Sequence, residues 1–166
     1  MNVVEANAAA VGRLLQLITP APDALEQEAV RDAVQAARDQ DLPLMWAVYQ
    51  LGRDEAVFAA EWPDVFSLVE QLRMVAANWQ ADVFFGVQEA EDEALVFECD
   101  PRWLLQVAAR ELSGYGLALW RWQGDNPDLC LGFVCREEDG DLLLQCATAL
   151  EARLLRVEDE DWPEDG

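Results

Sequence analysis

The chain has 166 residues, of which 33 are acidic and 11 are basic, and every basic residue is an arginine, so the formal net charge is −22. Proteins bind the phosphates of nucleic acids and anionic membranes through cationic side chains, which displace the counterions held there. Because carboxylates far outnumber cations in this chain, we expect no direct binding to nucleic acid or to an anionic membrane surface. Histidine is absent, which excludes a Ser-His-Asp triad, a Cys-His dyad and any zinc site that uses histidine.

Hydrophobic residues make up 52% of the chain and include seven tryptophans, which predicts a folded domain rather than a disordered acidic chain. We expect residues 1–156 to form a single α+β domain and residues 157–166 to form a mobile acidic tail. The N-terminus has neither a basic region nor an unbroken apolar run, so a signal peptide and a membrane span are not expected. A cytoplasmic location is therefore predicted.

The predicted elements begin with a helix over residues 3–18, which has apolar residues along one edge. A second helix starts at Pro22 and is followed by two predicted strands, Leu44–Leu51 and Ala56–Ala60, with a turn at Gly52 between them. This segment is predicted to be a helix followed by a hairpin.

The same order of elements follows twice more. A helix is predicted to open near Pro63 and to lead into strands over Val83–Val87 and Ala94–Cys99, which are joined by an acidic turn. The next helix is predicted to begin with Asp100 as its N-cap and Pro101 as its first residue and to stop at Gly114.

The last predicted hairpin joins strands over Leu117–Gln123 and Leu129–Cys135, and a final helix is expected over Leu142–Leu155 with Asp141 as its N-cap. Three helix-plus-hairpin units predict an α+β fold with a mainly antiparallel six-stranded sheet, helices packed on one face, and extra N- and C-terminal helices. Side-chain identity between the units is weak, so the pattern fits either a triplicated unit or ordinary alternating elements.

The cysteines and tryptophans of the last hairpin indicate which way its strands face. Cys130 and Cys135 lie an odd number of residues apart on one predicted strand, so we expect their side chains on opposite faces of the sheet, unable to share a metal ion. Trp120 and Trp122 point to one side, and Arg121 points to the other. The tryptophans are interpreted as core residues beneath helices, with Arg121 in water. The alternative, which also applies to Trp46, is an exposed aromatic patch that anchors a partner.

Several carboxylates precede the predicted last helix. Glu137, Glu138, Asp139 and Asp141 are of the type that holds a hard cation, but they lack the alternating ligands and the distal glutamate of an EF-hand loop. We interpret them as a solvated acidic turn. No glycine-rich phosphate loop lies between a strand and a helix, so we predict no enzyme, no catalytic residues, no metal and no cofactor.

The leading hypothesis is an acidic binding protein that neutralises a basic protein by occupying the surface meant for nucleic acid. In general character, and not by any motif, the chain resembles the immunity proteins that neutralise nuclease toxins and the phage proteins that mimic DNA. The resemblance implies surface carboxylates in place of phosphates and a nuclease toxin or DNA-processing protein as partner. The partner-binding residues are predicted on the acidic turns, where they could form one acidic edge: Glu89, Glu91, Asp92, Glu93, Asp125, Asp128, Glu137, Glu138 and Asp139.

The alternative hypothesis is a small acidic secretion chaperone or adaptor, a class that the chain resembles in size, charge and mixed element order. Such proteins hold a secreted client through an apolar groove and usually dimerise, so a homodimer is a possible state. Binding by acidic decoys weakens steeply with salt, whereas chaperones depend on apolar surface residues, and this difference separates the two hypotheses.

Overall fold

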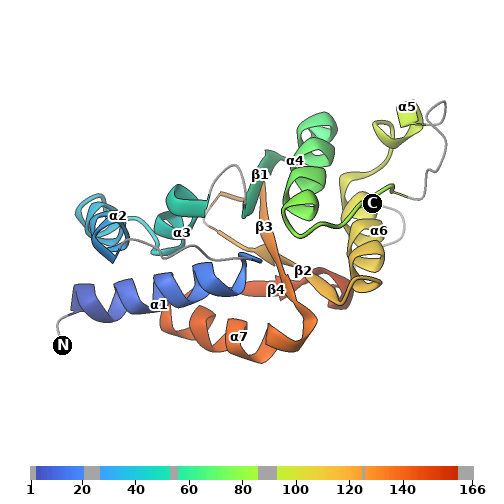
Figure 1. The fold of residues 1–166 in the computed structure, drawn as a ribbon. Coiled ribbons are helices and arrows are strands. Elements are labelled where there is room, and N and C mark those ends of the chain that lie inside the picture. The colour runs from blue at the N-terminus through green and yellow to red at the C-terminus, as the bar shows by residue number, and fades with distance from the viewer. Residues whose placement is uncertain (1–2, 21–26, 53–55, 86–92, 125, 161–166) are drawn as a thin grey trace.

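The structure is a computed structural model that describes residues 3–20, 27–52, 56–85, 93–124 and 126–160. Across these residues, four strands form one antiparallel sheet that lies between two layers of helices (Figure 1). None of the described helices combines the length and the apolar character needed to cross a membrane. The architecture is therefore α+β, with three layers.

The sheet is organised around two central strands, β2 (Leu117–Trp122) and β3 (Leu129–Arg136), which form a hairpin. β1 (Val57–Glu61) pairs with the other edge of β3, and β4 (Leu154–Arg156) pairs with the other edge of β2. The strand order is β1-β3-β2-β4. The hairpin predicted at this place in the chain is confirmed.

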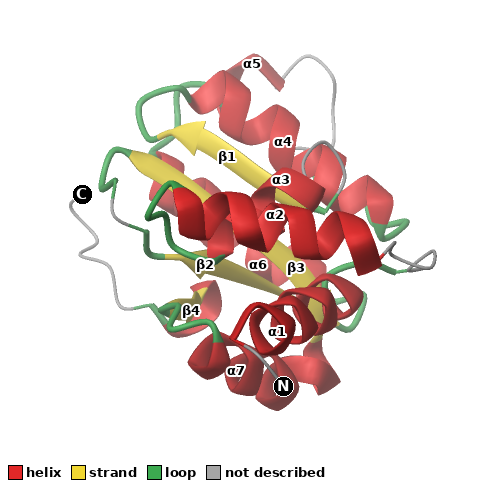
Figure 2. Cartoon of the chain, turned by 90° about the vertical axis from the view of Figure 1, so that its left-hand side faces the viewer, coloured by secondary structure: helices red, strands yellow, loops and turns green. Residues whose placement is uncertain are grey.

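One helical layer contains α1 (Val3–Leu17), α2 (Gln27–Asp39), α3 (Met45–Gly52) and α7 (Gly140–Ala149), and Figure 2 looks onto its outer side. The apolar residues of α2 recur at intervals of three and four, which places them on one side of the helix. This side is buried, so α2 packs into the layer. These buried residues are Val30, Ala33, Val34 and Ala37. We call this layer the α1–α3 layer.

The other layer contains α4 (Val65–Asn78), α5 (Glu93–Val96) and α6 (Pro101–Ser113), and we call it the α4–α6 layer. A short 3₁₀ turn, η3 (Val157–Asp159), packs against α6 and β2. Val157 is fully buried, so the first residues of the predicted tail lie against the domain, while residues 161–166 fall outside the described part of the chain.

The boundaries predicted for α6 are confirmed. Asp100 is its N-cap, where a side-chain oxygen accepts a hydrogen bond of 2.8 Å from the backbone N–H of Arg102. Pro101 is the first helical residue, where its missing N–H costs nothing, and Gly114 is the C-cap.

The predicted alternation of side chains along β3 is also confirmed. Cys135 is buried beneath the α1–α3 layer and Cys130 is buried beneath the α4–α6 layer. Trp120 and Trp122 lie in the core under the α1–α3 layer, and they are 5% and 3% exposed. The interpretation of this tryptophan pair as core is therefore correct.

The six-stranded sheet built from three hairpins is wrong. Leu44–Leu51 was expected to be a strand, but most of it is helix α3, and β1 pairs with β3 instead. A short apolar run fits a buried strand or a buried helix equally well by periodicity. Here Met45, Val48 and Gly52 are buried at helical spacing, which the strand interpretation overlooked.

The strands predicted for the second hairpin are not found among the described residues, and residues 86–92, which hold the end of its first strand and most of its turn, lie outside them. Where the strand Val83–Val87 was expected, the described residues 81–85 are irregular, and the backbone N–H groups of Asp82, Phe84 and Phe85 donate to side chains. Phe84 and Phe85 donate to the two carboxylate oxygens of Glu111 at 3.0 and 2.8 Å. The segment predicted as the strand Ala94–Cys99 contains most of helix α5.

Helices cover both faces of the sheet, so the prediction that they pack on one face is wrong. β3 is buried at six successive positions, and such a near-continuous apolar run is typical of a strand covered on both sides. Arg121, expected in water, is only 14% exposed, because its guanidinium pairs with Glu160 at 2.6 Å after η3. The chain after β4 therefore covers the face that was expected to be open.

The last predicted helix is too long. α7 ends at Ala149 because Glu151 takes a positive φ of 55°, which turns the chain away from the helix and into β4. Asp139, and not Asp141, occupies the N-cap position of α7. The β4 residues were predicted as helix because their apolar pattern continues that of α7 across the turn.

Candidate partner-binding face

The nine acidic residues predicted to bind a partner are spread over the molecule. Glu89, Glu91, Asp92 and Asp125 lie outside the described residues, and Glu93 is the first residue of α5. The described remainder are exposed or partly exposed: Asp128, Glu137, Glu138 and Asp139.

These described residues do not form one edge. Asp128 immediately precedes β3, whereas Glu137 immediately follows it. β3 has 8 residues. At about 3.4 Å per residue, the strand separates its two ends by roughly 25 Å. Only the group after β3, in the 3₁₀ turn η2 (Glu137–Asp139), brings several of the predicted carboxylates together.

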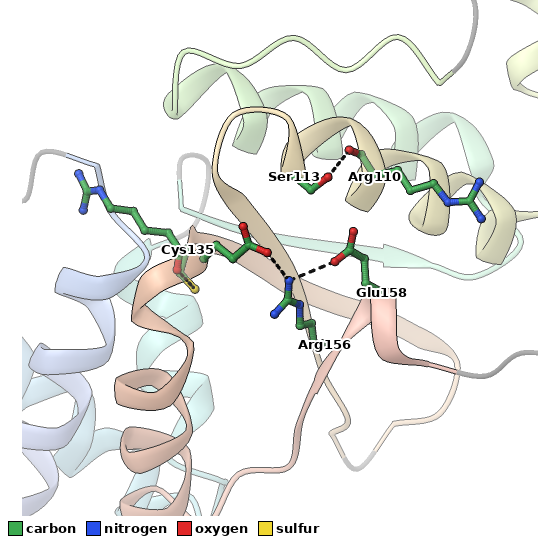
Figure 3. A network of polar contacts seen from close by, with 7 residues as sticks. Arg110, Ser113, Cys135, Arg156 and Glu158 are labelled. Carbon is green, nitrogen blue, oxygen red and sulfur yellow. Dashed lines mark hydrogen bonds and ion pairs between the residues drawn. The ribbon is translucent and has the colours of Figure 1, made fainter.

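An arginine partly neutralises this group. Arg156 of β4 donates to Glu137 at 2.7 Å and to Glu158 at 3.1 Å, and Figure 3 shows Arg156 beside Glu158 with dashed lines for its polar contacts. The hydrogen bond with Glu137 raises the pKa of Arg156, so this side chain remains charged. Glu138 has no ion pair within the described part of the chain, so its charge is available to a partner.

A hollow of about 590 Å³ opens beside η2, between the ends of α4, α6 and β3. Seven residues line it: Trp79, Tyr115, Gly116, Leu117, Arg136, Glu137 and Glu138. The backbone N–H of Glu137 donates to the carbonyl of Gly116 at 2.9 Å, which fixes η2 against the turn after α6. Two predicted binding residues therefore line a concave surface.

The aromatic residues of the hollow are held in place by their neighbours. The guanidinium carbon of Arg136 lies 5.1 Å from the ring centroid of Trp79, a cation–π distance. The hydroxyl of Tyr115 accepts a hydrogen bond from the backbone of Asp82 at 3.3 Å, although the side chain is 51% exposed. An aromatic wall beside carboxylates suits a side chain that carries both a cation and an apolar stem.

The exposed aromatic side chains of the described residues gather in the α4–α6 layer and the segments bonded to it. They are Phe66, Phe84, Trp103 and Tyr115. The other layer exposes aliphatic side chains instead, from α1, α7 and the α2–α3 connection: Val3, Leu42, Leu142 and Leu144. Aromatic residues are enriched at the centres of protein interfaces, so this layer is the candidate binding face.

Sequence reasoning placed the alternative aromatic patch at the wrong residues. Trp46 contacts Trp122 edge-on at 5.0 Å between ring centroids and is only partly exposed, so these rings cannot anchor a partner. Phe66 was missed, although helix periodicity marks it: the buried stripe of α4 runs through Leu68 and Leu72, which leaves Phe66 on another side of the helix.

The candidate face is also rich in acidic residues. Between residues 61 and 103 the sequence holds ten aspartates and glutamates and two arginines. Some of these carboxylates serve the fold: Asp64 caps α4 through the backbone N–H of Ser67 at 3.2 Å. Asp100 caps α6, and this hydrogen bond lowers its pKa. The acidic run from Glu89 to Glu93 connects Phe85 to α5, and both belong to this layer.

The two cysteines of β3 are buried thiols. Burial raises the pKa of the Cys130 and Cys135 thiols to about 12, so both are protonated and unreactive at neutral pH. Within the described ranges, no three His, Cys, Asp or Glu side chains are grouped so that they could hold a metal ion.

A second hollow, of about 760 Å³, lies between α1 and α2 and has a different character. Small residues line much of it, including Ala6, Ala9 and Gly12. Its charged lining residues are Glu5, Arg13 and Arg31, so arginines outnumber carboxylates here and the hollow suits a basic partner less well.

Comparison with known proteins gives one match. The model of a family described as a domain of unknown function (DUF6630) matches residues 10–158. No curated protein matches, and no solved structure matches.

Proposed function

We propose that this chain, which belongs to the DUF6630 family, is a non-enzymatic cytoplasmic protein that binds and blocks a basic protein partner. The partner is of the nuclease-toxin or DNA-processing class, whose basic surface normally meets nucleic acid. The chain acts as an acidic decoy and binds neither nucleic acid nor membrane itself. The partner docks on the α4–α6 layer.

The gathering of exposed aromatic side chains on the α4–α6 layer is the observation that carries this proposal. Phe66 is 56% exposed, Phe84 51% and Trp103 49%. Water-exposed aromatic surface is unfavourable in a monomer, and rings of this kind supply most of the energy at protein interfaces. The rings provide affinity, and the surrounding carboxylates select a basic partner.

The charge of the chain supports the same partner class. A net charge of −22 generates a long-range field that accelerates encounter with a basic protein and rejects acidic competitors. Glu137 and Glu138 bring this field to the rim of the hollow beside Tyr115, where a partner's arginine or lysine can lay its stem on the ring. Of the predicted binding residues, these two have the most direct geometric support.

The protonated state of the two buried thiols supports a non-enzymatic role. Cys130 and Cys135 offer no thiolate nucleophile at neutral pH, and the chain has no histidine to act as a general base. Binding therefore requires no chemistry beyond electrostatic and apolar contact.

The test is a pull-down from native lysate at low and at high salt with three forms of the protein. One form is wild type, the second carries Glu137→Gln and Glu138→Gln, and the third carries Glu28→Gln and Asp32→Asn on α2. Both variants lose two charges, and the Glu137/Glu138 variant also loses the ion pair between Glu137 and Arg156, so the folding of both is verified by circular dichroism. We expect a basic partner that salt releases, and that elutes at lower salt only from the Glu137/Glu138 variant.

Two outcomes contradict the proposal. One is a retained partner that is neutral or acidic or that resists salt. The other is equal weakening in both charge variants, which indicates a non-specific effect of net charge.

A small acidic secretion chaperone or adaptor remains the second candidate. The exposure of Phe66 and Leu95, both 56%, favours it, because clients of chaperones are held by apolar surface. In that case Phe66→Ala abolishes retention of a secreted client, and salt has little effect on the complex. Gene neighbourhood separates the candidates further, since a toxin gene favours the decoy and a secreted effector gene favours the chaperone.

A further inference from the structure

One part of the α4–α6 layer combines apolar and acidic surface in a way that specifies a partner segment. Phe66 of α4 and Phe97, which follows α5, lie with ring centroids 5.4 Å apart and planes tilted by 33°. Leu95 of α5, two residues before Phe97 in the chain, is a further exposed apolar side chain. We call these three residues the Phe66 patch.

The patch is exposed because of the way α4 and α5 are anchored. α4 buries one stripe against the sheet, and Phe66 lies off that stripe in the first turn of the helix. α5 has only four residues, and Val96, 1% exposed, anchors it to the core, which leaves its neighbour Leu95 facing outward. Figure 1 shows α5 next to the end of α4 where the helix begins. The local sequence therefore presents large apolar side chains that the fold does not cover.

Carboxylates accompany the patch. Glu70 is exposed and lies one helical turn after Phe66, on the same side of α4. Glu98 is exposed and directly follows Phe97. Asp64 is not counted with them, because its carboxylate accepts hydrogen bonds from both the backbone and the hydroxyl of Ser67. Glu70 and Glu98 thus give the patch an acidic rim.

We propose that the Phe66 patch docks a basic segment of the partner protein, which places an apolar side chain against Phe66 and Leu95 and its arginine or lysine residues toward Glu70 and Glu98. This inference rests on the proposed function and deepens it. An apolar centre with a charged rim is the usual anatomy of a specific protein interface.

Charge complementarity selects this occupant over others. A second copy of the chain brings Glu70 and Glu98 close to further carboxylates of a molecule with charge −22, and like charges across an interface oppose binding. A nucleic acid is repelled for the same reason. An uncharged apolar segment leaves the two carboxylates desolvated without partners. A segment that is both basic and apolar satisfies both features.

The experiment uses two synthetic peptides that carry equal numbers of arginines. In the first, leucines at helical spacing alternate with the arginines, and in the second, serines replace the leucines. Fluorescence anisotropy of the labelled peptides measures their binding to the full chain. We expect the leucine–arginine peptide to bind about tenfold more tightly than the serine–arginine peptide.

Substitutions on the protein show which residues cause the preference for the leucine–arginine peptide. Phe66→Ala and Leu95→Ala are expected to remove most of that tenfold difference, whereas Leu144→Ala, a leucine of α7 with 44% exposure, leaves it unchanged. Glu70→Gln is expected to weaken both peptides by a few-fold, whereas Glu28→Gln on α2 weakens neither beyond the effect of net charge. Circular dichroism verifies that each variant is folded.

The outcomes separate the two proposals. If both peptides bind equally and Phe66→Ala changes nothing, this inference is wrong while acidic capture stands. If neither peptide binds, both proposals fail. If wild type is a dimer in sedimentation and Phe66→Ala is a monomer, the patch is a contact between copies, and the inference is overturned.

Discussion

The α1–α3 layer and the α4–α6 layer cover opposite faces of the same sheet, but they differ in how exposed their aromatic side chains are. On the first layer, Trp46 and Tyr49 of α3 contact each other and Trp122 of β2; Tyr49 and Trp122 are buried, and Trp46 is partly buried. On the second layer, Phe66 and Trp103 face outward. The aromatic residues stabilise the fold on one side and are available for binding on the other.

The hollows of the two layers differ in the same sense. Between α1 and α2 the lining is mostly small side chains, with no aromatic ring, and its charged residues are Glu5, Arg13 and Arg31. Beside η2 the lining includes aromatic rings with Glu137 and Glu138. Under our proposal, net charge attracts a basic partner to the whole molecule, and these local differences direct it to one side. The proposed binding face is therefore the side of the molecule where exposed aromatic and acidic residues occur together.

The largest expected effect comes from removing a closed-off ring. Trp122→Ala should lower the free energy of unfolding by about 3–5 kcal/mol, because it leaves a cavity among Trp46 and Tyr49. Phe66→Ala should lower it by less than about 1 kcal/mol, since the ring is already 56% exposed. Urea denaturation of both variants measures the contrast. Equal decreases in the free energy of unfolding for the two variants would contradict the distinction between the buried ring of Trp122 and the exposed ring of Phe66.

A smaller decrease in the free energy of unfolding is expected from a substitution in β3, the central strand covered by both layers. A side chain at Gly132 would overlap the backbone oxygen of Trp120 and approach Cζ of Phe58 to 2.5 Å. Gly132→Ala should therefore cost about 1–3 kcal/mol of unfolding free energy. Gly12→Ala on α1, where nothing lies within 4 Å, is the control and should stabilise the chain by up to about 1 kcal/mol. A tolerated Gly132→Ala would contradict the packing of Phe58 across this strand.

Substitutions at Asp100, the N-cap of α6, test how much this cap contributes to the stability of the α4–α6 layer. Asp100→Ala should lower the unfolding free energy by about 1 kcal/mol at neutral pH, whereas Asp100→Asn, which retains an acceptor, should lower it less. Hydrogen bonding from the Arg102 backbone holds the pKa of Asp100 below its usual 3.8. Its charge therefore contributes fully above that value, and the contribution is lost as pH falls through the lower folded pKa. A pH-independent loss in Asp100→Ala would contradict this role.

The smallest expected effect is on a rate: how fast a thiol reagent modifies the buried cysteine beneath each layer. Cys135 lies under the α1–α3 layer and Cys130 under the α4–α6 layer, and both pKa values are about 12. A thiol reagent at mildly alkaline pH should modify either residue only when its layer opens. Mass spectrometry of the modified peptides gives the two rates. Rapid labelling of either cysteine in the native protein would show that its covering layer is not closed.

The sequence predicts the parts of the fold that depend on local chemistry. An N-cap followed by proline marks α6, and odd spacing puts Cys130 and Cys135 on opposite faces. The prediction fails where a local signal is ambiguous. Leu44–Leu51 is apolar on nearly all sides, so only its packing against the sheet decides that it forms α3. β4 is a strand only because the distant β2 pairs with it.

The candidate face was predicted in part for the same reason. Glu137 and Glu138 were identified because acidic turns are exposed regardless of the fold. Trp79 and Tyr115 join them only through the contact of the α4 and α6 ends with η2, which is a tertiary feature. Phe66 and Leu95 were not identified, because large apolar residues in a predicted helix (Phe66) or a predicted strand (Leu95) are usually assigned to the core.

The most direct test of the central claim is hydrogen–deuterium exchange of the chain alone and in complex with the salt-released partner from the native lysate. Our account predicts slower exchange in α4, α5, α6 and η2, with α1 and α2 unchanged. Protection confined to α1 and α2, or protection of neither layer in a verified complex, would contradict it.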